Sequence, residues 1–156
     1  MMGFISVLLI VLCFSGCFGK MSLYTYDYEN LKKEVVGVEI LDIGMTGQHN
    51  NRLYVLKNSE LEPFFMEFSQ ITFQKYVPPK SPSDHTFKLI YKDGSCALIS
   101  AGGGGKLNMQ GEFMEYAPCA YMEDSRREFY KLLSQYIELT EEDLRNAHLS
   151  KEDLKN

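Results

Sequence analysis

Two cysteines in the body of the chain, Cys96 and Cys119, have the widest range of chemistry. Outside the cytosol such a pair can form a disulfide, which would stabilise the fold by about 2–4 kcal/mol. Together with His85 they could hold zinc, and a thiol beside an imidazole could act as a nucleophile. The alternating residues around Cys96 predict a strand, in which a thiol is usually buried and inert. We therefore expect both thiols in the same half of the domain without a bridge, and we expect no metal site and no cofactor.

A run of glycines at 102–105, followed by Lys106, has the composition of a phosphate-binding loop. The spacing differs from that of such a loop. Ser100 stands where the pattern needs its first glycine, and Leu107 stands where it needs Ser or Thr. We therefore expect this run to connect two hairpins.

Acidic residues are numerous. Catalysis by a pair of carboxylates needs a cleft, and nothing in the sequence indicates one. Glu141, Glu142 and Asp143 stand together at a predicted helix start, where the helix dipole favours negative charge. The three histidines, His49, His85 and His148, are scattered and have no zinc-ligand spacing. The sequence therefore predicts that the protein is not an enzyme.

The first residues of the chain form an uncharged apolar run. Apolar residues fill 4–14 with one interruption, Ser6. This run has the length of a signal-peptide core and is shorter than the roughly 20 residues that cross a bilayer. It predicts an export signal over residues 1–16. Secretion with cleavage after Gly19 and retention of an uncleaved anchor remain as alternatives.

Ser15-Gly16-Cys17, directly after this run, resembles the lipobox of bacterial lipoproteins. The resemblance implies that Cys17 receives a diacylglyceryl group and becomes the new N-terminus, often with a further fatty acid. Two or more acyl chains give stable anchoring, since each buried methylene contributes about 0.8 kcal/mol. The body, with Tyr91-Lys92-Asp93-Gly94 in its central turn, is also similar to small uncharacterised bacterial lipoproteins. That resemblance adds no functional residue beyond Cys17.

Charge and composition limit the partners. The formal net charge is −5, and no cluster of Lys and Arg is longer than a pair. Nucleic acid is therefore excluded as a partner, because phosphate binding needs concentrated positive charge. Ten Tyr and ten Phe favour a folded domain that contains β-strands.

The spacing of apolar residues predicts the regular elements. Apolar residues at i, i+3, i+4 and i+7 predict helices over 59–70 and 125–137, with Ser59 and Ser125 as caps. Asp93-Gly94 predicts a two-residue hairpin turn that places Tyr91 opposite Cys96, with Leu89 opposite Leu98. A second hairpin should place Lys106 opposite Glu115. Strands are predicted over 34–43, 52–57, 71–76, 86–91, 95–100, 106–109 and 112–116.

These elements predict an α+β fold, with a twisted, mainly antiparallel sheet and the two amphipathic helices packed against it. We divide the chain into a signal peptide (1–16), a lipid attachment site and tether (17–33), a single α+β domain (34–139) and a charged tail (140–156). Capping patterns from Thr140 to Asp143 and from Ser150 to Asp153 predict a short helix in the tail.

We expect a non-enzymatic binding or interaction lipoprotein on the extracytoplasmic face of a bacterial cell membrane. Its partners would be the membrane, through the lipid anchor, and an unknown protein or small ligand. Alternatives are a membrane-tethered immunity or inhibitor protein and a small envelope hydrolase. Binding residues concentrate on loops, which here are Pro78, Pro79 and Lys80 in one loop and Gly102, Gly103 and Lys106 around the other.

Overall fold

A computed structural model describes residues 22–43, 50–75 and 85–155. The helices and strands in these ranges are, in chain order, β1 (Ser22–Tyr24), α2 (Tyr28–Glu34), β2 (Val35–Ile43), β3 (Asn50–Val55), α3 (Asn58–Phe68), β4 (Phe73–Lys75), β5 (His85–Tyr91), β6 (Cys96–Ile99), β7 (Gly104–Leu107), β8 (Phe113–Tyr116), α4 (Glu123–Leu133) and α5 (Glu141–Asn146).

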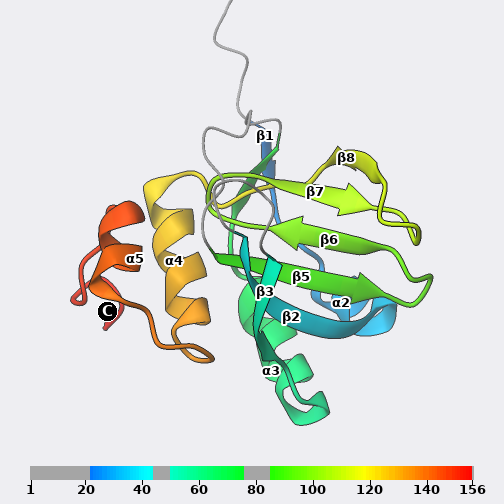
Figure 1. Cartoon of the computed structure of the whole chain (residues 1–156), viewed down its shortest axis with the longest axis horizontal. Coiled ribbons are helices and arrows are strands. Elements are labelled where there is room, and N and C mark those ends of the chain that lie inside the picture. The colour runs from blue at the N-terminus through cyan, green and yellow to red at the C-terminus, as the bar shows by residue number, and fades with distance from the viewer. Residues whose placement is uncertain (1–21, 44–49, 76–84, 156) are drawn as a thin grey trace, which may run out of the picture.

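Six strands form one sheet in the order β3-β2-β5-β6-β7-β8, and every neighbouring pair is antiparallel. A second, two-stranded antiparallel sheet joins β1 to β4. Figure 1 shows the strands of the large sheet side by side, with α4 and α5 beside it. The expected α+β class with a mainly antiparallel sheet is confirmed.

Aromatic rings fill the space between the large sheet and the helices. Phe64 and Phe68 of α3 stack with ring centroids 5.1 Å apart. Phe87 of β5 contacts Phe64 at 5.1 Å and Phe129 of α4 at 5.0 Å. All four side chains are fully buried. The apolar faces of α3 and α4 thus meet on one strand of the sheet, as the spacing of their apolar residues predicts.

The central hairpin has a different register from the one predicted. Leu89 pairs with Ala97, and Ile90 pairs with Cys96. The turn has three residues: the Gly94 N–H donates to the Tyr91 carbonyl at 3.0 Å, and Gly94 adopts a φ of 84°. A three-residue turn with glycine in the left-handed region shifts the register by one place. Relative to the predicted register, every β6 side chain therefore lies on the opposite face of the sheet, and Ala97 and Ile99 lie in the core.

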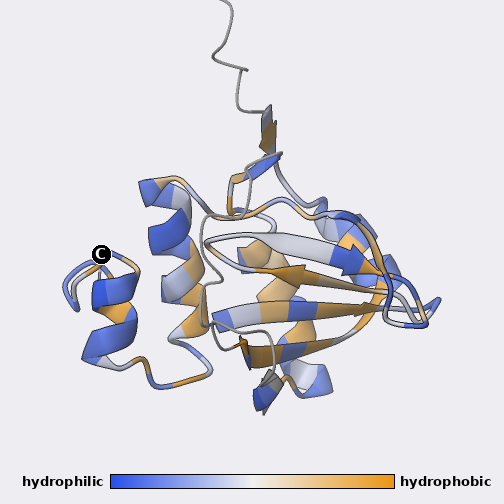
Figure 2. Ribbon diagram, turned by 45° about the horizontal axis from the view of Figure 1, so that its top comes forward, coloured by the Kyte–Doolittle hydropathy of each residue, from blue (hydrophilic) through white to orange (hydrophobic). Residues whose placement is uncertain are grey.

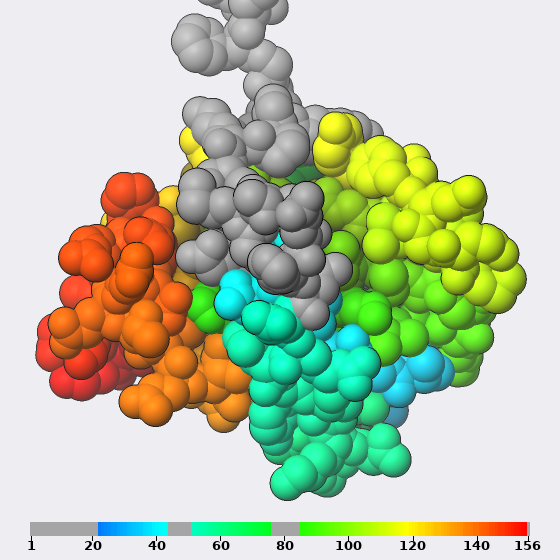
Figure 3. Space-filling view, in the orientation of Figure 1, coloured from blue at the N-terminus to red at the C-terminus, as the bar shows by residue number. Residues whose placement is uncertain are grey.

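The β7–β8 hairpin pairs Lys106 with Glu115, as predicted. The glycine run contributes to β7 itself, because Gly104 pairs with Ile99 and Gly105 pairs with Leu98. Figure 3 shows this hairpin and α5 at opposite ends of the molecule.

The predicted caps of the two main helices are wrong. α3 begins one residue before Ser59, and the carboxylate of Glu60 accepts a hydrogen bond from the Lys57 N–H at 2.7 Å. Ser125 lies inside α4 and is buried. Its hydroxyl accepts a hydrogen bond from Gln74 and donates one to the Thr72 carbonyl. The Ser125 side chain therefore joins α4 to the segment around β4 and does not cap the helix.

Residues 22–33, which were assigned to the tether, take part in the folded body. They include β1 and most of α2, and Tyr26 and Leu31 are buried in the core. The boundary at residue 34 is therefore wrong, because two buried apolar side chains precede it.

At the other end of the chain, the capping pair of Thr140 and Asp143 is present. The Asp143 N–H donates to Thr140 Oγ1 at 3.1 Å, and the Thr140 N–H donates to Asp143 Oδ2 at 2.7 Å. Figure 2 shows that α5 is largely hydrophilic, but Leu144 on its inner side is buried.

Among the described ranges, no helix combines the length and the apolar content that a membrane crossing requires.

Candidate functional site

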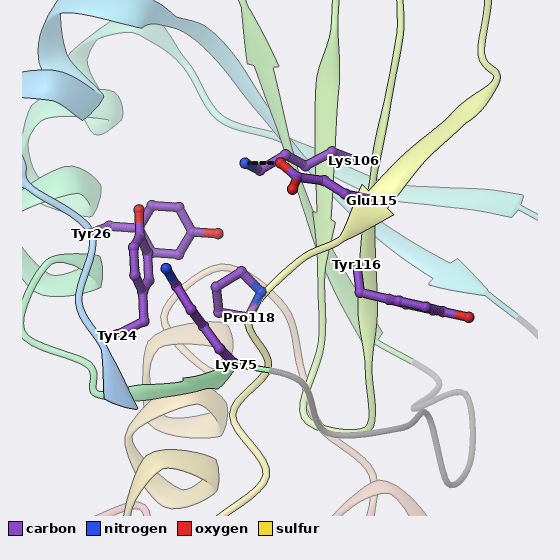
Figure 4. Close-up of a pocket in the computed structure, with 7 residues that line it drawn as sticks. All are labelled: Tyr24, Tyr26, Lys75, Lys106, Glu115, Tyr116 and Pro118. Atoms are coloured by element: carbon purple, nitrogen blue, oxygen red, sulfur yellow. Dashed lines mark hydrogen bonds and ion pairs between the residues drawn. The ribbon is translucent and has the colours of Figure 1, made fainter. Parts of the chain in front are cut away.

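A pocket of about 140 Å³ lies where the small sheet approaches the outer strands of the large sheet (Figure 4). Its walls come from segments that are far apart in the sequence: β1 and the residues after it, the end of β4, and the β7–β8 hairpin. The lining residues are Tyr24, Tyr26, Lys75, Lys106, Glu115, Tyr116 and Pro118.

The small sheet positions the aromatic wall. Tyr24 pairs with Phe73 across the β1–β4 ladder. Tyr26 follows two residues later and packs against Phe73 and Phe68, with ring centroids 5.4 Å and 5.1 Å away. The rings of Tyr24 and Tyr26 meet edge to face at 4.9 Å and 90°. Both tyrosines are therefore held by the core, which gives the pocket a rigid aromatic side.

The hydroxyl of Tyr26 is the most unusual group in the pocket. The residue is only 7% exposed, and its oxygen has no hydrogen-bond partner among the described residues. Figure 4 shows its ring pointing into the pocket. Leaving a buried polar group without a partner costs about 1–3 kcal/mol. Burial, with smaller contributions from Tyr91, Tyr24 and Glu115, raises the pKa of Tyr26 well above its usual value, so the hydroxyl remains a donor.

The charged wall has three groups. Lys106 Nζ and Glu115 Oε1 form an ion pair at 2.6 Å, and the hydrogen bond from Lys106 is the main cause of the lowered pKa of Glu115. Lys75 Nζ lies 4.5 Å from the centroid of the Tyr24 ring, a cation–π contact. Within the described part of the chain, Lys75 has no carboxylate partner at ion-pair distance. One cation of the pocket is therefore available to a ligand.

This arrangement suits recognition of a ligand. A tyrosine hydroxyl and an ammonium group can both donate hydrogen bonds to a ligand oxygen. Both donors can therefore hold a ligand oxygen.

Some of the residues predicted from the sequence lie in the pocket and others do not. Lys106 lines it. Gly102 and Gly103 lie in a turn around Ser100, whose Oγ accepts their N–H groups at 3.3 Å and 3.1 Å and donates to the Gly103 carbonyl at 2.6 Å. The remaining predictions, Cys17 for the lipid and Pro78, Pro79 and Lys80 for contact, lie outside the described residues.

The two cysteines are free thiols on different parts of the fold. Cys96 pairs with Leu107 inside the large sheet, whereas Cys119 is buried and forms a β-bridge with Gln74 of β4. Burial raises the pKa of both thiols. No group of three or more potential metal ligands occurs in the parts that the structure describes. His85 is the third residue of the zinc hypothesis. Its Nδ1 lies 3.8 Å from Oδ1 of Asp143 in α5.

Reasoning from the sequence missed Tyr24, Tyr26 and Lys75. Tyr24, Tyr26 and Tyr28 alternate with polar residues, a pattern compatible with an edge strand, within the range 17–33 that the sequence analysis gives to the tether. Nothing local in the sequence indicates that residues 22–26 pair with 73–75. The site is therefore assembled by a contact between distant segments, which periodicity does not predict.

Neither a protein-family model, nor a curated protein, nor a solved structure matches this chain.

Proposed function

We propose that this protein is a non-enzymatic binding module, anchored by lipid on Cys17 to the outer face of a bacterial cytoplasmic membrane. We further propose that the pocket around Tyr26 is its ligand site. The observation that carries the binding role is the buried Tyr26 hydroxyl, which has no hydrogen-bond partner among the described residues and points into the pocket in Figure 4. Buried polar groups without partners are rare in folded proteins, and a ligand is one explanation for them.

The state of the thiols favours binding over the hydrolase alternative. A reactive cysteine needs a lowered pKa and an electropositive surrounding. Burial raises the pKa of Cys96 and of Cys119 instead. We expect both thiols to react slowly with iodoacetamide in the native protein, and rapid labelling of either would favour the hydrolase.

The position of the pocket fits an anchored protein. Tyr24 follows Cys17 by seven residues, which span about 25 Å when fully extended. A lipid on Cys17 would therefore keep the pocket close to the membrane surface. A ligand near that surface would be within reach without a long linker.

The anchor is tested by feeding cells an alkyne fatty acid and labelling the protein by click chemistry. We expect label on the parent protein and none on a Cys17→Ala variant. Label on Cys17→Ala, or an unlabelled parent, would contradict the anchor and favour simple secretion.

The binding role is tested independently of the anchor. The full-length chain in detergent micelles is titrated with a set of anionic, neutral and cationic fragments, and its backbone amides are followed by NMR. We expect at least one charge class to shift the amides of Tyr24, Lys75 and Tyr116. If no fragment perturbs these amides, the pocket is not a ligand site.

A further inference from the structure

We propose that the pocket around Tyr26 binds a carboxylate group, carried by a small molecule or by the C-terminus of a peptide. This inference rests on the proposed binding function and specifies the chemistry of its ligand.

The charges of the pocket favour an anion. Lys75 and Lys106 contribute two positive charges and Glu115 one negative charge, so the lining has one positive charge in excess. Glu115 already pairs with Lys106 at 2.6 Å. The excess charge is therefore on Lys75, which the face of the Tyr24 ring holds in place. One available cation balances the single negative charge of a carboxylate.

The Tyr26 hydroxyl supplies a second donor. It is buried, it points into the space that Lys75 also lines, and it has no acceptor among the described residues. A carboxylate has two oxygens that each accept hydrogen bonds. One oxygen can accept a hydrogen bond from the ammonium group of Lys75 while the other accepts a hydrogen bond from the hydroxyl of Tyr26. Charge-assisted hydrogen bonds of this kind are about twice as strong as neutral ones.

The size of the pocket limits what can accompany the carboxylate. Its volume of about 140 Å³ is close to that of a cavity of about 150 Å³ that holds benzene. Drug-sized ligands fill pockets of about 300–1,000 Å³. The buried part of the ligand is therefore a carboxylate with a short side chain, next to the rings of Tyr24 and Tyr26.

The test compares N-acetylalanine with N-acetylalaninamide, two probes of similar size that differ in charge. Both are titrated into the full-length chain, with the amides of Tyr24 and Lys75 followed by NMR. We expect the acid to bind at least about tenfold more tightly than the amide, because only the acid carries the negative charge that forms an ion pair with Lys75. Equal binding of the two probes would overturn the proposal.

Matched variants locate the effect. Tyr26→Phe and Lys75→Gln should each weaken binding of N-acetylalanine by about five- to tenfold, because each removes one donor. Tyr28→Phe and Lys92→Gln, which change residues outside the pocket, should leave binding unchanged. Thermal melting confirms that each variant is folded. Equal losses in the pocket and control variants would contradict the assignment.

Further probes distinguish the source of the carboxylate. Tighter binding of alanyl-alanine than of acetate would indicate a peptide C-terminus, and equal binding would indicate a free small acid. Tighter binding of inorganic phosphate than of either would overturn the carboxylate assignment. If neutral or cationic fragments occupy the pocket while N-acetylalanine does not, the carboxylate proposal fails and the binding function stands.

Discussion

At the scale of single residues, Gln74 shows how one buried polar side chain can connect two parts of the fold. It is only 1% exposed. Its Oε1 accepts the N–H groups of Tyr121 and Met122 at 2.7 Å and 3.0 Å, and its Nε2 donates to Ser125 at 3.0 Å. These bonds satisfy backbone donors at the entry to α4, where a helix leaves N–H groups free.

We expect Gln74→Met to lower the free energy of unfolding by about 3 kcal/mol, because it removes three hydrogen bonds of a buried side chain, to the N–H groups of Tyr121 and Met122 and to Ser125. Urea denaturation followed by circular dichroism measures the loss. Gln70→Met is the matched control, since Gln70 is exposed and its side chain makes one long hydrogen bond, to Ser69 at 3.5 Å, among the described residues. A similar loss in both variants would contradict the role assigned to Gln74.

Gly104 is required by close packing. A Cβ at this position would lie 2.3 Å from the Leu98 carbonyl oxygen, whereas a Cβ at Gly37 would have its nearest neighbour at 3.6 Å. We therefore expect Gly104→Ala to destabilise the fold by about 2–3 kcal/mol through overpacking, and Gly37→Ala to change stability little. Thermal melting of the two variants compares them. A Gly104→Ala protein as stable as the parent would contradict the close approach of β6 and β7 at this position.

At the scale of elements, the sequence predicts the two main helices well. The predicted ranges 59–70 and 125–137 overlap α3 and α4 closely, since an apolar stripe at helical spacing is a local property. Their caps were wrong, because Ser125 forms its hydrogen bonds with residues about 50 positions away.

The hairpin register was wrong for a similar reason. Asp93-Gly94 is compatible with both a two-residue and a three-residue turn, and only packing of Ala97 and Ile99 in the core decides between them.

The packing of α3 predicts a sharp difference between two adjacent residues. Phe65 is buried, whereas Met66 is 56% exposed. Phe65→Asp should abolish cooperative unfolding, because it places an unpaired charge in the core. Met66→Asp introduces the same charge on the surface and should leave a cooperative transition. Calorimetry distinguishes them, and equal behaviour of the two variants would refute the packing of α3 on the sheet.

At the scale of the whole molecule, the many partly buried tyrosines predict sensitivity to alkali. Burial is the main cause that raises the pKa of Tyr91 and of Tyr136 to about 12, against about 10 in an unfolded chain. Between these values the folded state holds protons that the unfolded state has lost. The free energy of unfolding should therefore fall as the pH rises from about 10 towards 12.

Urea midpoints between pH 8 and pH 12 test this dependence. The double variant Tyr91→Phe, Tyr136→Phe should show a shallower decline than the parent. Identical pH profiles for the two proteins would assign the alkaline loss to other groups.

The candidate site belongs to the whole molecule as well, since β1, β4 and the β7–β8 hairpin all contribute to it. The sequence predicts the pairing of Lys106 with Glu115 because the hairpin that joins them is local. Tyr24 and Tyr26 fall in the predicted tether, because Tyr26 is buried by contact with Phe68 and Phe73 and Tyr24 is positioned by pairing with Phe73, all distant in the sequence. Pairing between segments about 50 residues apart produces the site, and no motif in either segment indicates it.

The most direct test of the ligand site is thermal melting of the parent and of Tyr26→Phe, each with and without N-acetylalanine. Removing a buried hydroxyl that has no partner in the part of the chain that the structure describes should raise the melting temperature of the ligand-free variant by about 2–5 °C. The same variant should gain less stability from N-acetylalanine than the parent does, because it has lost one donor to the carboxylate. Tyr26→Phe would then be the more stable protein and the weaker binder. A variant that is destabilised without ligand, or that gains as much from N-acetylalanine as the parent, would contradict a ligand-binding role for the Tyr26 hydroxyl.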